Sequence, residues 1–242
     1  MDKNQYSSVE GKYTLQARYF PAILTVFPFF FLLNIIRNFY INPTLEGILI
    51  FIPYLVQVGL SGAAFYLQMQ LNRFISKEIF QNRLFNGEDK FPTTLNLLWH
   101  DKTINNSTKQ ILHTKIKSLF EISLLDAEAE ILDECNAKKL IIVAVSQIRN
   151  LLRKNEQQVQ HNREYGFWRN LAGGSVVSVC ISIIIIIIEI IKCDYSSIVI
   201  GSIMLFIYCL LICFSPYLIR KHGQYYAKSL FEQFLSLKEK EK

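Results

Sequence analysis

The sequence is poor in the residues that punctuate or cross-link small soluble folds. Its 242 residues include ten glycines and six prolines, and positions 68 to 169 contain only Gly87, Gly166 and Pro92 of these two types. A sheet of short strands needs many turn residues, so this scarcity favours long helices. None of the five cysteines forms a CxxC pair, which indicates neither a disulfide framework nor a zinc site.

The sequence also lacks the motifs that catalysis usually needs. Its four histidines are scattered, and none stands in an HExxH or an equivalent metal-binding spacing. A P-loop, a GxSxG turn and a GxGxxG followed by an acid are missing as well. We therefore predict no enzyme activity, no metal site and no cofactor.

What the sequence contains instead is long apolar runs, in a chain that is 51% hydrophobic. A bilayer core about 30 Å thick needs about 20 apolar residues in a helix. Four windows meet that length, the first being the weakest because Asn34 interrupts it: Phe20–Ile36, Leu45–Leu67, Leu171–Ile191 and Ile198–Ile219. They predict an all-α integral membrane protein with four transmembrane helices, two before and two after an inserted helical cytoplasmic module.

The distribution of Lys and Arg predicts the orientation of these spans. Fifteen basic residues lie between Arg73 and Arg169 and six follow position 219, whereas the two short connectors hold only Arg37 and Lys192. Basic flanks stay on the cytoplasmic side, so both termini and the module should be cytoplasmic. The predicted domains are a cytoplasmic segment 1–18, hairpin 19–67, the cytoplasmic module 68–169, hairpin 170–219 and a basic tail 220–242.

The module should contain three helices and one folded corner. We expect residues 68–85 to continue the second span, a second helix to run from Ser107 toward Leu125, and a third to cover Asp126–Lys154. The apolar side expected for the third helix is Ile131, Cys135, Ile141, Val145, Ile148 and Leu152. The block FPTTLNLLWHD, residues 91–101, is best explained as a corner with buried Leu and Trp, although a small-ligand pocket is an alternative.

Acidic residues gather at the start of the predicted third helix: Asp126, Glu128, Glu130, Asp133 and Glu134. Because Arg149, Arg153 and Lys154 lie at its other end, the pattern matches the helix macrodipole and is typical of a solvated helix. The alternative is that these acids line a cation-attracting vestibule in an oligomer.

The third span carries a polar stripe. Ser175, Ser178, Ser182 and Glu189 are separated by three, four and seven residues, so they share one side of the helix with Ile185. If several copies surround an axis, these five residues should line a pore, with the glutamate selecting cations and the isoleucine constricting the path. For the glutamate the alternative is that it reaches the outer surface or pairs with Lys192.

The second span repeats this spacing in Tyr54, Gln57, Ser61 and Gln68. Polar side chains inside a bilayer normally face other helices or water, so both stripes should point inward. The plainer interpretation is that they are hydrogen-bonding contacts between helices. Gly173 and Gly174 should allow another helix to approach the third span closely.

The blocks FPTTLNLLWHD and YGFWRNLAGG resemble blocks of the Hailong membrane effectors of bacterial anti-phage operons. The resemblance implies a homotetrameric ion channel of the bacterial inner membrane that causes abortive infection. It also implies control by an oligodeoxyadenylate made by a partner nucleotidyltransferase. Candidate ligand contacts are basic residues that solubilising or lipid-facing roles explain equally: Lys138, Lys139, Arg149, Arg153, Lys154 and Arg163.

Two other functions compete with the channel. A non-conducting membrane scaffold or receptor would dock a cytoplasmic partner through the helical module and use the stripes only for packing. A small transporter would use Glu189 as an ion carrier, although the two halves show no convincing inverted repeat.

Overall fold

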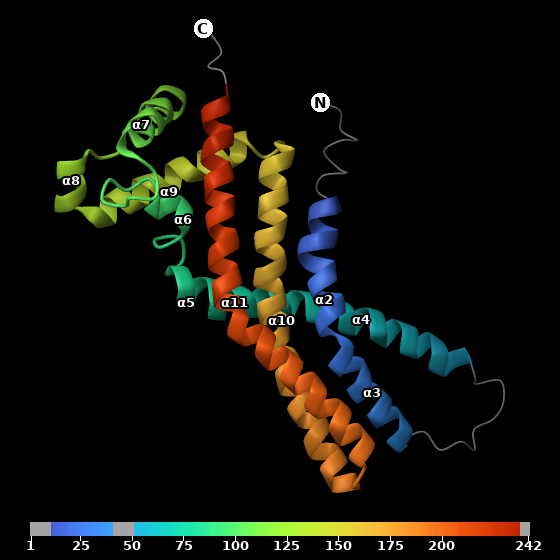
Figure 1. Cartoon of the computed structure of the whole chain (residues 1–242). Helices are drawn as coiled ribbons and strands as arrows, with labels where there is room; N and C mark the ends of the chain where they lie inside the picture. The colour runs from blue at the N-terminus through green and yellow to red at the C-terminus, as the bar shows by residue number, and fades with distance from the viewer. Residues whose placement is uncertain (1–10, 41–50, 238–242) are drawn as a thin grey trace. The chain divides into compact units, whose positions relative to one another are not determined.

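The computed structural model describes residues 11–40 and 51–237, and Figure 1 shows helices joined by loops. No strand occurs within these two ranges. Besides π-helical turns at Leu15–Tyr19 and Ser76–Gln81, the helices are α2 (Phe20–Thr25), α3 (Phe27–Tyr40), α4 (Phe51–Ile75), α5 (Asn82–Phe85), α6 (Pro92–Leu95), α7 (Asn106–Phe120), α8 (Ala127–Leu132), α9 (Glu134–Leu151), α10 (Glu156–Lys192) and α11 (Tyr195–Ser236).

Three helical segments of the described chain are long and apolar enough to cross a bilayer: Gly11–Ile36, Glu156–Lys192 and Tyr195–Ser236. They support the prediction of an all-α membrane protein. The predicted second span, Leu45–Leu67, begins outside the described residues and continues from Phe51 as α4. The count of four spans therefore stays a prediction, as do the inserted module and the orientation.

The chain forms two compact units. Of the described residues, the membrane unit consists of Thr14–Phe80 and Gly166–Tyr217, and the head unit consists of Gln81–Tyr165 with residues 11–13 and 218–237. Helices α10 and α11 contribute residues to both units.

The head unit is built around an apolar core. Side chains from α7, α9 and the end of α11 surround two fully buried residues of the 91–101 block, Leu97 and Leu98. The other buried members are Leu112, Ile116, Ala137, Ile141, Ala144, Val145, Ile148, Leu152, Leu230, Phe231 and Phe234. The expected folded corner is therefore present, because Pro92 starts α6 and the chain then turns both leucines into this core.

The predicted third helix is wrong in one respect, since it breaks at Asp133. This residue has φ −144° and ψ 73°, and its carboxylate accepts a hydrogen bond from the backbone of Asn136 at 3.0 Å, so it ends α8 and caps α9. Because of this break, residues before Asp133 no longer share a side with the residues of α9. Ile131 and Cys135, expected on the apolar side, are exposed, whereas the four later positions are buried.

Helix α7 starts at Asn106, one residue before the predicted Ser107. The side chain of Asn105 caps it by accepting a hydrogen bond from the backbone of Thr108 at 2.7 Å. The helix ends at Glu121, whose left-handed conformation stops it before the predicted Leu125. By contrast, the expected helical continuation of α4 to Phe85 is confirmed, and left-handed Asn86 and Gly87 end it.

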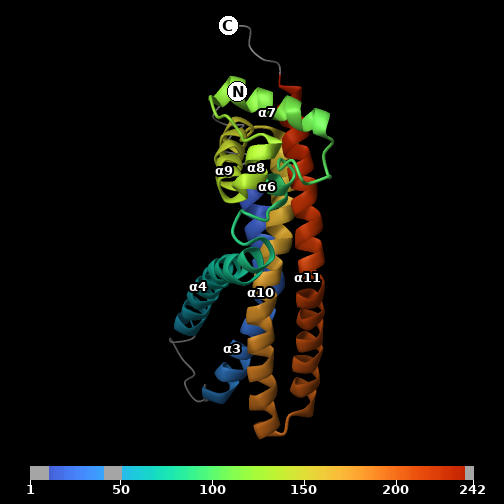
Figure 2. The same ribbon diagram turned by 90° about the vertical axis from the view of Figure 1, so that its left-hand side faces the viewer.

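Helices α10 and α11 run side by side as a long hairpin in both views (Figures 1 and 2). Its turn is short, because α10 ends at Lys192 and α11 begins at Tyr195. Cys193 adopts φ 59°, and the carboxylate of Asp194 accepts hydrogen bonds from the backbone of Ser196 and the hydroxyl of Ser197. The predicted connector 192–197 is thus mostly helix.

Candidate functional site

The first candidate site is a break between α2 and α3 inside the membrane unit. Pro28 has no N–H group, so the carbonyl of Leu24 loses its intrahelical donor. The backbone N–H groups of Phe29 and Phe30 both donate to Val26, at 3.0 and 3.2 Å, which frees the carbonyl of Thr25 as well. Free carbonyls in an apolar unit need other donors.

Side chains from three helices supply those donors. The hydroxyl of Tyr208 on α11 donates to the carbonyl of Leu24 at 2.8 Å. Ser178 on α10 and Gln68 on α4 donate to the carbonyl of Thr25, at 2.7 and 3.4 Å. The helix break is therefore held by long-range side-chain contacts.

The hydroxyl of Thr25 joins the same network. It donates to the carbonyl of Pro21 at 2.8 Å and accepts from the side-chain amides of Gln68 at 3.2 Å and Asn72 at 2.9 Å. Gln68 also donates to the side-chain oxygen of Asn72 at 3.0 Å. We call Thr25, Gln68, Asn72, Ser178 and Tyr208 the polar knot.

Two glycines let α10 cross α4 beside the polar knot. A Cβ atom on Gly174 would lie 2.5 Å from the hydroxyl of Thr25 and 2.6 Å from the amide nitrogen of Asn72. A Cβ atom on Gly173 would lie 2.7 Å from the backbone nitrogen of Ser76 and would also meet the carbonyl of Asn72. The predicted close approach is confirmed, because no other residue fits at this crossing.

One turn earlier on α10, Asn170 extends the polar contacts. Its side-chain oxygen accepts from the hydroxyl of Ser76 at 3.1 Å, and its amide nitrogen donates to the carbonyl of Ala17 at 2.6 Å. Asn170 is buried. Neutral side chains therefore join the first helical segment, the π-helical turn that follows α4, and α10.

The predicted stripe on α10 shares one side of the helix and lies inside the chain. Ser175, Ser178, Ser182 and Ile185 are fully buried, and Glu189 is 3% exposed. The three hydroxyls donate to carbonyls four residues earlier, and Ile185 packs with Ile35 of α3. Side chains buried within one chain cannot face an axis shared by several copies, so pore lining stays a prediction for a different arrangement of α10.

Glu189 is turned inward although α10 ends one turn later. Lys192 donates to its carboxylate at 3.4 Å, and the lysine is more exposed than the glutamate. Of the alternatives for this residue, the pairing with Lys192 is present, whereas extension to the outer surface is absent. The glutamate thus lies with the buried hydroxyls rather than with the solvent-facing turn.

The second predicted stripe is described only in part. The side chains of Tyr54 and Gln57 lie outside the described residues, and Ser61 is half-buried. Gln68, which continues that stripe, belongs to the polar knot.

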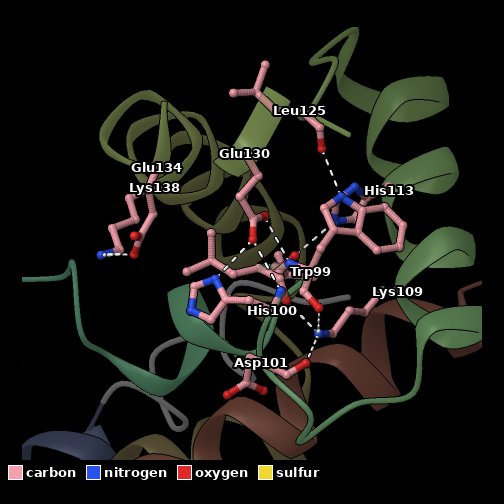
Figure 3. A network of polar contacts seen from close by, with 11 residues as sticks. Trp99, His100, Asp101, Lys109, His113, Leu125, Glu130, Glu134 and Lys138 are labelled. Atoms are coloured by element: carbon pink, nitrogen blue, oxygen red, sulfur yellow. Dashed lines mark hydrogen bonds and ion pairs between the residues drawn. The ribbon is translucent and has the colours of Figure 1, made fainter. Parts of the chain in front are cut away.

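The second candidate site is a polar network in the head unit (Figure 3). Lys109 is fully buried, and its ammonium donates to the backbone carbonyls of Leu98 and Asp101. Burial lowers the pKa of Lys109, and the negative charges of Asp101 and Glu130 oppose that shift. A buried lysine of this kind fixes the loop that follows Leu98.

Glu130 completes that network from α8. Its carboxylate accepts hydrogen bonds from the backbone of Trp99 at 2.9 Å and of His100 at 3.2 Å, and lies 3.1 Å from the ring of His100. The indole of Trp99 donates to the carbonyl of Leu125 at 2.9 Å. Glu130 is buried, so its predicted place among solvent-exposed vestibule acids is wrong, whereas Asp126, Glu128, Asp133 and Glu134 are exposed.

His113 closes the network on the α7 side. Its Nε2 atom lies 3.0 Å from the carbonyl of Leu97, and its ring meets the indole of Trp99 edge-on at 4.7 Å. Burial lowers the pKa of His113, partly offset by the hydrogen bond to Leu97. With these contacts the polar groups from Leu97 to Asp101 are used for folding, which supports the corner over the ligand pocket.

The predicted ligand contacts are not equivalent. Arg149 pairs with Glu88 at 3.0 Å, contacts Thr93 and lies near the rings of Phe91 and Tyr226, so it holds the head unit together. Lys138 pairs with Glu134 at 2.6 Å. The remaining candidates are exposed or half-buried: Lys139, Arg153, Lys154 and Arg163.

Sequence reasoning missed the centre of the membrane unit. Thr25, Asn72, Asn170 and Tyr208 carry its hydrogen bonds, and only Pro28 in the first apolar window signalled a helix break there. Among residues 11–40 and 51–237, no group of three or more His, Cys, Asp or Glu side chains is arranged to hold a metal ion.

Comparison with known proteins adds no relative. No family model, curated protein or solved structure matches the chain. The resemblance to the Hailong effectors therefore rests on the two quoted sequence blocks alone.

Proposed function

We propose that the chain is a subunit of an oligomeric, gated cation channel of the bacterial inner membrane, an effector of anti-phage defence, and that the described conformation is closed. The sequence resemblance supports the biological role and the homotetramer. The polar side of α10, now buried, would line an ion path if α10 moved away from its neighbours. In this proposal the protein is not an enzyme.

The observation that carries the proposal is the position of Glu189. A carboxylate one turn from a helix end can reach water, yet this one is 3% exposed and shares its azimuth with three buried hydroxyls. Charged groups kept inside a membrane unit are costly and mark ion pathways more often than packing sites. A ring of such carboxylates selects cations once water reaches it.

Opening requires α10 to leave α2 and α3. Ser178 must release the carbonyl of Thr25, and Ile185 must separate from Ile35. Hydrogen bonds between membrane helices contribute only about 0.6 kcal/mol each on average, so this seal can be reversed by a ligand. Because α10 and α11 contribute to both units, a change in the head unit has a direct route to the seal.

The controlling ligand is proposed to be a nucleotide or oligonucleotide that binds the head unit. Lys139, Arg153 and Lys154 are its proposed contacts, since their side chains are exposed. Binding of an oligodeoxyadenylate to the purified protein should weaken with salt and after Lys139→Ala together with Arg153→Ala. Unchanged binding in this double variant would remove these contacts from the proposal.

Ion flux through reconstituted protein tests the channel directly. Liposomes or planar bilayers containing the full chain should conduct cations in at least one ligand state, and Glu189→Gln should lower conductance or cation selectivity several-fold. The matched control is Asp194→Asn, which removes an exposed acid five residues away and should leave conduction unchanged. No conductance with or without oligodeoxyadenylate would falsify the proposal.

One observation favours the second candidate, a non-conducting membrane scaffold or receptor. The whole predicted pore stripe is sealed within a single chain, as expected if it serves only for helix packing. The scaffold predicts a monomer or dimer in detergent and silent bilayers. A ring of four or more copies around an axial path would exclude it.

A further inference from the structure

Helix α8 presents the two most exposed large hydrophobic side chains of the described residues. Ile131 is 82% exposed and Leu132 is 87% exposed. Burying side chains of this size is strongly favourable, in a core or at an interface. A neighbouring pair left outside the core is a candidate contact surface.

The helix that carries this pair is fixed in place. The side chain of Asp126 caps its start by accepting from the backbone of Ala129 at 2.8 Å, and Asp133 caps the helix that follows. Between them, buried Glu130 binds the backbone of Trp99 and His100. The two apolar side chains are therefore held on a rigid support, which reduces the entropy lost on docking.

The surroundings of this pair are acidic. Asp126, Glu128, Asp133 and Glu134 are exposed, and no basic residue occurs from 126 to 134. Negative charge repels anionic lipid headgroups and nucleic acid phosphates. The partner must therefore offer an apolar groove beside positive charge.

The head unit itself carries such a groove elsewhere on its surface. An open groove of about 600 Å³ lies between α7 and the end of α11, and Ile111 and Leu235 are its apolar side chains. Its lining residues are Ser107, Gln110, Ile111, Thr114, Lys115 and Leu235, of which Ile111 is 57% exposed. Helix α7 has no acidic residue, and its exposed lysine, Lys117, lies one turn beyond Thr114. Its other two lysines, Lys109 and Lys115, are buried and donate to backbone carbonyls.

We propose that α8 of one copy docks Ile131 and Leu132 into the α7–α11 groove of a second copy of this chain. The α8 pair is exposed and the groove is open in a single chain, so the pair does not occupy the groove of its own chain. A contact between two different surfaces is heterologous, and it closes into a ring when the rotation allows. The inference rests on the proposed oligomer but does not require that the oligomer conduct ions.

Cysteine cross-linking of the full chain in membranes tests this contact. The background replaces the five native cysteines, all of which are free, with serine. Leu132→Cys combined with Ile111→Cys should then give a ladder of cross-linked multimers under mild oxidation. Each single variant should give at least ten-fold less product, because a heterologous contact pairs position 132 with position 111. Both positions are exposed, so neither change disturbs the core.

A matched control keeps the outcome interpretable. Leu132→Cys with Val143→Cys, which is similarly exposed on α9, should give no ladder. Efficient cross-linking by Leu132→Cys alone would overturn the proposal in favour of a two-fold contact, and absence of any link between 132 and 111 would overturn it outright. Because this readout needs no ion flux, its failure is distinct from failure of the channel proposal.

Discussion

The membrane unit and the head unit both contain backbone groups outside regular helical hydrogen bonding, and different kinds of side chain bind them. In the membrane unit, the carbonyls freed by the break after Thr25 are bound by neutral side chains, from Ser178, Gln68 and Tyr208. In the head unit, the backbone of the corner is bound by two buried charges, Lys109 and Glu130. Burying a charge costs free energy, and the cost is especially high between apolar helices in a bilayer. In the head unit, burial of the large hydrophobic core beside Lys109 and Glu130 offsets that cost.

The largest loss of stability should come from replacing a glycine at the helix crossing of the membrane unit. Gly174→Ala places a methyl group 2.5 Å from the hydroxyl of Thr25, so α4 and α10 must separate. We expect a loss of stability on the order of 4 kcal/mol or more. Size-exclusion chromatography of heated, detergent-solubilised protein measures it.

Gly62→Ala is the control for that change. A Cβ atom at Gly62 meets nothing within 4 Å, and alanine favours a helix over glycine by about 1 kcal/mol. The variant should be as stable as the parent or slightly more so. Equal loss in both variants would show that the crossing at Gly174 is not the cause.

A smaller effect should follow from removing charge in the head unit. Glu130→Gln replaces one acceptor oxygen by a donor that faces the backbone N–H groups of Trp99 and His100. The expected destabilisation is about 1 to 3 kcal/mol, the usual consequence of leaving buried donors without partners. Urea unfolding followed by tryptophan fluorescence measures it, and exposed Glu128→Gln should change stability by less than about 0.5 kcal/mol.

Removing one hydroxyl from the polar knot should cost less stability than Glu130→Gln costs in the head unit. Thr25→Val leaves the amides of Gln68 and Asn72 without one acceptor and should cost about 1 kcal/mol, two bonds at the membrane average. Ser182→Ala removes only a bond within α10 and should be nearly neutral. If Thr25→Val lost more stability than Glu130→Gln, the neutral network of the membrane unit would matter more to folding than the buried charge of the head unit.

The smallest expected effect is a pH dependence confined to the head unit. Burial lowers the pKa of His113 below its unfolded value of 6.5, so the unfolded chain binds the proton more readily. The contribution of His113 to stability should be constant above about pH 7 and should fall as pH drops below about 6.5, toward the folded-state pKa. Unfolding at pH 8 and pH 5 measures it, and His113→Gln should remove this part of the pH dependence.

Local signals predicted the polar side of α10 and its close crossing with α4, but not the polar knot beside that crossing. The spacing of Ser175, Ser178 and Ser182 placed them on one side of α10, and the pair at Gly173 indicated a close helix crossing. The buried pair of Lys109 and Glu130 was not predictable, because each charge is explained only by backbone groups that lie 8 to 31 residues away. Equally, the exposed Ile131 depended on the break at Asp133.

The sequence by itself determined that the chain is helical, that it holds long apolar segments and that one side of α10 is polar, because helix period and hydropathy are local properties. Only the tertiary structure decided that this polar side faces α3 and the break after Thr25 within the same chain. Residue spacing fixes the angle of a side chain about its own helix axis, but the neighbour at that angle is set by contacts between distant segments.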